Sequence, residues 1–145
     1  FNQKWMKDLN DTYNKGKGYG SSVIATHDYI TTNEWARQGW LHFDKQRSFK
    51  FFVYLTDVDS TCGSLTMSPK SHKEGGRLRK YMVNNGKYEN ERKLEETNKE
   101  LIKKYPFEPI EGKSGTLIIF DTDTFHKGGV VEKNKERLII RLHNK

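Results

Sequence analysis

The chain has 145 residues, of which 33% are hydrophobic and 31% are charged. This length suits one domain with one core, and eight Phe, seven Tyr and three Trp residues can bury enough area to argue against intrinsic disorder. No apolar run approaches the length of a membrane span, and the N-terminal FNQKWMKDLN lacks the apolar segment of a secretory signal. These features exclude disordered and membrane-spanning classes and predict a soluble protein.

The 26 Lys and Arg residues outnumber the 19 Asp and Glu residues, which gives a net charge of +7. This excess favours acidic substrates, nucleic acid or membrane surfaces, and charge alone does not choose among them. Cys62 is the single cysteine, so an internal disulfide and a cysteine-rich zinc site are excluded. A cytoplasmic protein fits this cysteine usage. The chain begins with Phe1 instead of Met, which fits a fragment of a longer protein.

The first half of the chain contains three strand-like segments. Residues 21–30 (SSVIATHDYI) are an apolar patch, and residues 40–44 (WLHFD) precede a longer aromatic run at residues 48–59 (SFKFFVYLTDVD). In that run Phe51 and Phe52 point to opposite faces, so both faces are apolar. This pattern predicts a strand that is buried on both sides, as in the wall of a sandwich or barrel.

The second half of the chain alternates between strand-like and helical sequence. A short strand is expected at residues 65–67, and residues 77–105 are rich in helix formers and stop before Pro106. Residues 111–129 and 136–145 return to strand patterns, separated by a Gly-Gly turn and a charged hairpin. We therefore expect all 145 residues to form one mainly β domain, an antiparallel sandwich or barrel with a surface helical insertion.

Two side chains in WLHFD give the first chemical signal. His42 and Asp44 are two residues apart in strand-like sequence, so both project from the same face. A histidine beside a carboxylate supplies two of the three ligands of the 2-His-1-carboxylate facial triad, which holds Fe(II) and leaves coordination positions open. His126, at the end of the next strong strand region, is the candidate for the second histidine. On spacing alone, structural hydrogen bonding is the commoner explanation of such a pair.

The last strand adds an arginine that is directed into the core. Arg137 follows the second histidine by eleven residues, in the strand ERLIIRL. It shares one face of that strand with Ile139 and Arg141. A buried charge needs a partner. Two kinds of partner remain open, a protein carboxylate such as Asp121 or Asp123, or an acidic ligand such as the distal carboxylate of 2-oxoglutarate.

Four features occur in one order along the chain. They are LHFD, then FVYLTDVD followed by GSLTMSPKSHK, then GTLIIFDTDTFHKGG, and an arginine eleven residues after the histidine of that last motif. In this order and spacing the chain resembles the phytanoyl-CoA dioxygenase family of Fe(II)/2-oxoglutarate-dependent oxygenases, from about Trp40 to Leu142 without the helical insertion. The resemblance implies a double-stranded β-helix, a cupin-like jelly-roll with peripheral helices.

The resemblance also implies an activity and a set of ligands. By likeness, His42, Asp44 and His126 bind Fe(II), and Arg137 binds the carboxylate of the cosubstrate 2-oxoglutarate. Tyr54, on the strand after the HxD motif, is a further candidate for the cosubstrate pocket, with a core tyrosine as the alternative. Such an enzyme uses O2 to hydroxylate a small molecule or an acyl or conjugated substrate, with release of succinate and CO2. The carboxylate two residues after the first histidine favours hydroxylation, because related halogenases have a small residue there.

One part of the chain departs from the family pattern. Little sequence precedes the first recognisable strand, whereas family members carry N-terminal helices that help to cover the active site. Trp35, Trp40 and Phe43 are candidates for lining the mouth of the site, with core packing as the alternative. The substrate-binding half is therefore the part that the resemblance defines least.

Other reactive side chains give weaker signals. His72 and Glu74 form a rival HxE pair, but the surrounding sequence predicts a turn, in which the two side chains need not share a face. His27 and His143 have no spaced partner and are expected to be structural or exposed. Cys62 lacks the sequence context of a thiol hydrolase.

Two other classes of function remain as alternatives. A jelly-roll module can keep the fold and bind a metal or ligand without turnover. A basic nucleic-acid-binding domain is the other, but the chain lacks an interleaved aromatic and basic ladder or a recognised motif. The expected partner is therefore a small-molecule substrate, not nucleic acid or a membrane, and the sequence carries no signal for an oligomeric state.

Overall fold

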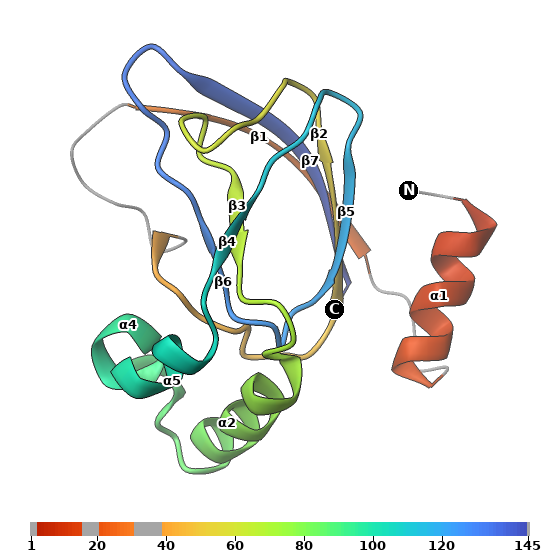
Figure 1. Ribbon diagram of the computed structural model, residues 1–145. Coiled ribbons are helices and arrows are strands. Elements are labelled where there is room, and N and C mark those ends of the chain that lie inside the picture. Colours follow the sequence, from red (N-terminus) through yellow and green to blue (C-terminus); the bar gives the residue numbers. More distant parts are fainter. Residues whose placement is uncertain (1–2, 16–20, 31–38, 145) are drawn as a thin grey trace.

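Two antiparallel β-sheets face each other, with helices outside them (Figure 1). This computed structural model describes residues 3–15, 21–30 and 39–144. The larger sheet has the strand order β1-β7-β2-β5, formed by Ser21–Tyr29, Glu136–Asn144, Phe49–Tyr54 and Leu117–Asp121. The smaller sheet has the order β4-β3-β6, formed by Glu108–Ile110, Leu65–Met67 and His126–Gly128. The strand pairings are antiparallel, and this arrangement confirms the predicted jelly-roll class.

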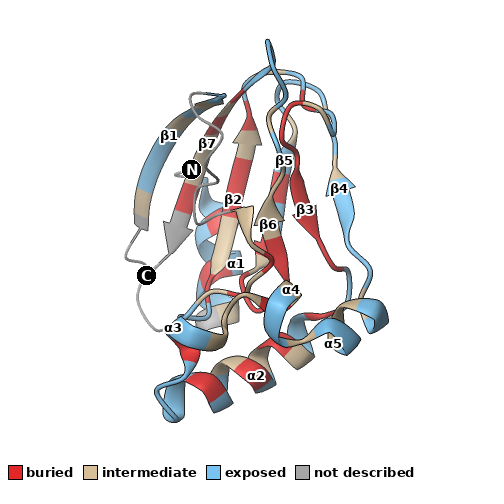
Figure 2. Cartoon of the chain, turned by 90° about the vertical axis from the view of Figure 1, so that its left-hand side faces the viewer, coloured by how far each residue is buried: buried red, intermediate tan, exposed pale blue. Residues whose placement is uncertain are grey.

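The main core lies between the two sheets, and strand β2 supplies much of it (Figure 2). Phe52 and Tyr54 of β2 point inward and pack against apolar side chains of β3, β5 and β7. Because alternate residues of a strand face opposite ways, Phe51 points outward. There it is fully buried beside Met6 of helix α1 (Lys4–Asn14). Strand β2 is therefore buried on both faces, as its sequence predicts.

Helices that follow β3 close one end of the sandwich (Figure 1). They are α2, α3, α4 and α5, which span His72–Asn84, Tyr88–Glu91, Leu94–Thr97 and Lys99–Lys104. Apolar side chains of these helices form a second cluster with residues of the nearby loops: Leu41, Phe43, Leu78, Met82, Tyr88, Leu94 and Phe125. The predicted helical insertion is present, but it begins at His72 instead of Arg77. No helix within residues 3–15, 21–30 and 39–144 combines the length and the apolar character needed to cross a bilayer.

The turn expected at residues 69–76 is present only at residues 69–71, because helix α2 begins at His72 and includes Gly75. A Cβ added at Gly75 would lie only 1.8 Å from the backbone oxygen of Asp123. The glycine that suggested a turn instead allows the helix backbone to approach the loop between β5 and β6 closely.

Two strand expectations also differ from the structure. The WLHFD segment forms no strand and pairs through a single bridge, between His42 and His126. The charged hairpin expected around residues 133–136 is present only as a turn at residues 133–134, and the two apolar runs on either side of it do not pair, because β2 lies between β5 and β7 in the larger sheet. The segment between these two runs includes β6, which crosses to the smaller sheet.

Candidate metal centre

Backbone pairing brings together the two segments that contain the predicted ligands. The amide of His42 donates to the carbonyl of His126 (3.0 Å), and the amide of His126 donates to the carbonyl of His42 (2.8 Å). Two residues further on, the amide of Asp44 donates to the carbonyl of Thr122 (3.0 Å). One ligand atom from each of His42, Asp44 and His126 lies within 4.8 Å of the other two. Three side chains from two distant segments thus meet at one point.

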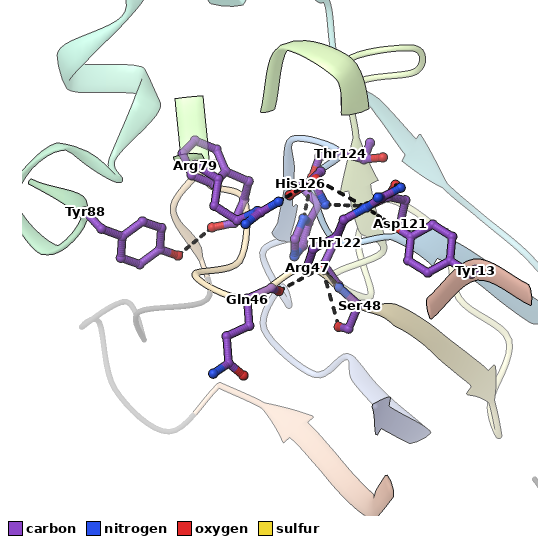
Figure 3. Close-up of polar contacts among 12 residues, drawn as sticks. Tyr13, Gln46, Arg47, Ser48, Arg79, Tyr88, Asp121, Thr122, Thr124 and His126 are labelled. Atoms are coloured by element: carbon purple, nitrogen blue, oxygen red, sulfur yellow. Dashed lines mark hydrogen bonds and ion pairs between the residues drawn. The ribbon is translucent and has the colours of Figure 1, made fainter. Parts of the chain in front are cut away.

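The residues next to these three ligands point the other way. Leu41, Phe43 and Phe125 are completely buried in the apolar cluster under the helices. Because neighbouring side chains of extended chain alternate, this packing turns the three ligands away from the helices and toward one another. The hydroxyl of Tyr88 donates to the carbonyl of Phe43 (2.6 Å), a contact drawn in Figure 3. The helical insertion therefore fixes the loop that carries two of the ligands.

Backbone carbonyls determine which nitrogen each histidine presents. The Nδ1 atom of His42 lies 2.5 Å from the carbonyl oxygen of Trp40. The Nδ1 atom of His126 lies 2.7 Å from the carbonyl oxygen of Thr124, a pair that Figure 3 shows. A carbonyl only accepts, so each Nδ1 must carry the proton in these bonds. In the neutral rings, both Nε2 atoms then keep a lone pair, the form in which histidine binds a metal.

The two Nε2 atoms converge on a single carboxylate oxygen. Oδ1 of Asp44 lies 3.8 Å from Nε2 of His42 and 3.6 Å from Nε2 of His126. Nε2 of His126 is buried and has no hydrogen-bond partner among the residues that the structure describes. A buried nitrogen without a partner is costly, and a bound metal ion removes that cost. Two imidazoles and one carboxylate fit the donor set of non-haem Fe(II).

The electrostatics keep His42 and Asp44 in the deprotonated form that a metal needs. Burial, followed by the proximity of His126, lowers the pKa of His42 to about 4. Burial alone would raise the pKa of Asp44, but His126 and Lys50 outweigh it and hold that pKa well below its usual range. Nζ of Lys50 lies 2.6 Å from Oδ2 of Asp44, which leaves Oδ1 facing the histidines. At neutral pH no proton has to leave His42 or Asp44 before an ion binds.

A cavity of about 290 Å³ opens beside His42 and Asp44. Its other lining residues are Trp40, Lys50, Tyr88, Arg92 and Arg141. Trp40 thus lies at the position that sequence reasoning suggested for the mouth. Sequence reasoning did not identify the remaining four as lining residues. Only Arg141 could have been identified from the sequence, because it shares the inward face of its strand with Arg137. The others reach the cavity from segments that only the tertiary fold brings together.

Arg137 and Tyr54 lie elsewhere in the sandwich and do not line this cavity. Arg137 is buried and paired with Asp28 of β1, through Nε (3.0 Å) and Nη2 (2.8 Å), and it also donates to the carbonyl of Gly63. The suggested partners Asp121 and Asp123 are therefore wrong. The register of β1 against β7 sets Asp28 directly opposite Arg137.

The hydroxyl of Tyr54 is fully engaged within the core. It donates to the carbonyl of Ile110 (2.8 Å) and accepts a bond from the amide of Leu65 (3.1 Å). Tyr54 is completely buried, so its contacts are those of the core tyrosine that stood as the alternative.

Polar side chains at the end of β5 and in the β5–β6 loop hold that loop against its surroundings (Figure 3). Asp123 accepts two bonds from Arg79 of α2, from Nε (2.6 Å) and Nη2 (3.3 Å). Asp121 lies 3.4 Å from Nη2 of Arg47. The amide of Ser48 donates to the hydroxyl of Thr122 (2.8 Å). These contacts fix the loop that ends at His126.

The other reactive side chains are not drawn into this site. His72 is exposed at the start of α2, and His27 is exposed and lies 2.8 Å from Glu136. Cys62 is buried in the main core, while Phe43 is buried beneath the helices instead of lining the cavity. Trp35 and the side chain of His143 lie outside the described residues. Within the described part of the chain, His42, Asp44 and His126 are the one group of three such residues placed to hold a metal.

Solved structures share this fold at low sequence identity. One is EvdMO1, and another is AviO1, which comes from Streptomyces viridochromogenes Tue57. Each aligns with 99% of this chain, with a TM-score of 0.55 and 14% identity. Apo HygX from Streptomyces hygroscopicus aligns with 86%, with a TM-score of 0.50 and 13% identity. The aligned parts are 31% of EvdMO1, 58% of AviO1 and 57% of HygX, so this chain spans less than two thirds of each.

The sequence comparisons give one family. The search of curated proteins returned no significant match. The sequence model of the phytanoyl-CoA dioxygenase (PhyH) family matches residues 2–138. This range is nearly the whole chain and includes all three candidate ligands. The chain therefore belongs to the phytanoyl-CoA dioxygenase (PhyH) family.

Proposed function

We propose that this chain is the catalytic part of an Fe(II)/2-oxoglutarate-dependent oxygenase that hydroxylates a small organic substrate and releases succinate and CO2. The observation that carries the proposal is the convergence of His42, Asp44 and His126 on one point, with both Nε2 lone pairs free for a metal. Family membership supports the same reaction class.

In this proposal the three side chains hold the ion from one side. Nε2 of His42, Nε2 of His126 and one oxygen of Asp44 would hold the ion, and the cavity beside His42 and Asp44 leaves room for other ligands. Fe(II) bound there supplies the redox chemistry by which dioxygen oxidises 2-oxoglutarate and a substrate C–H bond. Asp44 fills the third protein position, which favours hydroxylation over halogenation. Lys50 orients that carboxylate through its other oxygen.

Arg137 is the proposed partner of the distal carboxylate of 2-oxoglutarate. It is buried on the inward face of β7, and its spacing from His126 is the one that the family resemblance requires. Asp28 neutralises it in this structure, so the proposal requires Arg137 to exchange or share that ion pair when the cosubstrate binds. Tyr54 keeps a proposed role in that pocket only if its hydroxyl exchanges its bonds to Ile110 and Leu65.

The test is an anaerobic titration of the metal-free chain with Fe(II) and 2-oxoglutarate. We expect the weak visible charge-transfer band of the iron–keto acid chelate, and we expect His42→Ala and Asp44→Ala to abolish it. The matched control is His72→Ala, which removes an exposed histidine that is not one of the three candidate ligands and should retain the band. Absence of the band in the wild-type chain would contradict the proposal.

Turnover distinguishes this function from that of a non-catalytic binding module. With oxygen, ascorbate and a panel of candidate small molecules, the proposed enzyme forms succinate from 2-oxoglutarate. A chain that gives the chelate band but forms no succinate with any candidate would instead be a jelly-roll module that binds metal and ligand without turnover.

A further inference from the structure

The cavity beside the candidate metal ligands has an excess of positive charge. Lys50, Arg92 and Arg141 line it, and Asp44 is the one carboxylate among its described lining residues. Lys50 is already paired with Asp44 at 2.6 Å. The Nε atoms of Arg92 and Arg141 are buried and have no hydrogen-bond partner among the described residues. Glu89 lies 3.5 Å from Nη1 of Arg92, whereas no ion pair with a described residue reaches Arg141. Both guanidinium groups nevertheless keep a buried Nε–H donor that no described residue accepts.

Arg141 contrasts with its neighbour on the same strand face. Arg137 has a carboxylate partner in Asp28, whereas no ion pair with a described residue joins Arg141. Burial lowers the pKa of Arg141, yet a guanidinium stays protonated in proteins, so the charge remains. A partly buried and unpaired guanidinium is costly, and an oxyanion bound in the cavity would remove that cost.

The cofactors of the proposed function do not supply this anion. Fe(II) and 2-oxoglutarate carry charges of equal size and opposite sign, so binding both leaves the excess of cations unchanged. The distal carboxylate of 2-oxoglutarate is assigned to Arg137. Arg92 lies in the helical insertion and not in the motifs that contain the three candidate ligands and Arg137, so the proposed function gives it no part in binding the cosubstrate.

The wall of the cavity suits a ligand that also has an apolar part. Trp40 is one of the lining residues. Nζ of Lys93 lies 3.9 Å from the centre of the Trp40 ring, and the guanidinium of Arg92 lies 5.7 Å from it. Tyr88 lines the same cavity, and its hydroxyl is held by the carbonyl of Phe43. Aromatic faces next to guanidinium groups provide apolar contact on one side and paired hydrogen bonds on the other.

We propose that Arg92 and Arg141 form an oxyanion subsite that binds a carboxylate or phosphate group of the substrate, next to the metal centre. That the bound anion belongs to the substrate rests on the proposed function. The binding of an anion by the two arginines does not. The subsite assigns an acidic molecule as the substrate class, held by the acid group while its apolar part lies against Trp40 and Tyr88.

The first test compares two probes of the same shape, phenylacetate and its neutral amide, phenylacetamide. Their dissociation constants are measured by calorimetry with the chain loaded anaerobically with Fe(II) and 2-oxoglutarate. We expect phenylacetate to bind at least about tenfold more tightly, and we expect Arg92→Met and Arg141→Met each to remove that preference. Arg77→Met removes an exposed arginine of α2 and should leave it unchanged. Equal affinity for the two probes, or equal loss in R77M, overturns the subsite.

The second test separates the substrate anion from the cosubstrate. We expect R92M and R141M to bind 2-oxoglutarate within about twofold of the wild type, and Arg137→Met to bind it at least about tenfold more weakly. If R141M weakens 2-oxoglutarate binding as much as R137M does, Arg141 serves the cosubstrate and the subsite proposal fails. If R141M does not fold, R92M decides, because Arg92 lies in the insertion and not in a strand.

The two proposals fail in different ways. If the wild-type chain does not bind 2-oxoglutarate, the proposed function fails, and the comparison of the two probes with Fe(II) alone still judges the subsite. If 2-oxoglutarate binds normally and the chain does not prefer phenylacetate, the subsite fails while the proposed function stands.

Discussion

At the scale of single residues, the carbonyl groups of Trp40 and Thr124 decide what the two histidines can do. Each carbonyl accepts the Nδ1 proton of the histidine two residues later in the chain. The acceptors are backbone atoms, so the orientation of both rings depends on the path of the chain. Residues that fix that path therefore control the metal centre without touching it.

Arg79 is one such residue. It lies on α2 and binds Asp123 in the loop that leads to His126, and both side chains are largely buried. We expect Arg79→Met to lower the free energy of unfolding by about 3 kcal/mol, because breaking a buried pair leaves one charge behind. Arg47, 3.5 Å from Asp123, compensates only partly. Urea denaturation of the metal-free chain measures this change.

The matched control is Arg77→Met, two residues earlier on the same helix. Arg77 is 65% exposed and pairs with Glu74 on the surface, so its loss should cost less than about 1 kcal/mol. If both variants lose the same stability, the Arg79–Asp123 pair does not hold the loop.

Tyr88 is the second residue of this kind. Its hydroxyl binds the carbonyl of Phe43, the residue between two candidate ligands. Tyr88→Phe leaves that buried carbonyl without this donor, which should cost about 1–2 kcal/mol and weaken metal binding as well. Tyr81→Phe, on the exposed side of α2, should change neither quantity. A normal metal affinity in Y88F, measured by calorimetry, would show that the insertion does not position the ligand loop.

At the scale of elements, the contact between helix α2 and the β5–β6 loop supports the site. The helix backbone passes so close to Asp123 that only glycine fits at position 75. The same loop carries Thr124 and Phe125, which orient and anchor the residue that follows, His126. The helical insertion is thus part of the support of the metal centre.

Gly75→Ala tests this contact. The added Cβ would meet backbone atoms, which cannot rotate away, so helix and loop must separate, and we expect a loss of more than about 2 kcal/mol together with weaker metal binding. Gly86→Ala is the control, because a Cβ there meets nothing within 4 Å and costs only the strain of its left-handed backbone, about 1 kcal/mol. Thermal melts of the two variants compare these costs. Equal losses would contradict the close contact.

The same contact explains where prediction from sequence failed at this scale. The long strands were predictable, because runs such as SFKFFVY and ERLIIRL combine strand-forming residues with apolar faces. The start of α2 was not, because Gly75 and Gly76 are typical of a turn and their real function depends on a loop far away in the sequence. The separation of β5 from β7 by β2 is likewise a property of the sheet and not of either segment.

At the scale of the whole molecule, two distant segments meet only when the sandwich is closed. A metal ion that bridges them binds the folded chain and has no such site in the unfolded chain. We therefore expect free Fe(II) at about 100 times its dissociation constant to raise the free energy of unfolding by about 2.7 kcal/mol. The gain should vanish with a chelator and in Asp44→Ala. Anaerobic denaturation with and without Fe(II) measures it, and an equal gain in D44A would place the ion elsewhere.

The candidate site was partly predictable for reasons that follow from this folding. His42 and Asp44 share a face by local geometry, and His126 follows from the family motif. The partner of Arg137 was not predictable, because Asp28 reaches it only through the pairing of the first strand with the last. The positions of Arg92 and Tyr88 in the cavity wall were not predictable either, because both come from an insertion whose sequence is typical of a solvated helix surface.

The most direct measurement is a crystal structure of the Fe(II)-loaded chain with anomalous scattering recorded at the iron edge. We expect one iron peak, bonded to Nε2 of His42, Nε2 of His126 and a carboxylate oxygen of Asp44 at about 2.0–2.2 Å. An iron peak that lies away from these three atoms, or full loading of the chain without them, would contradict the central claim.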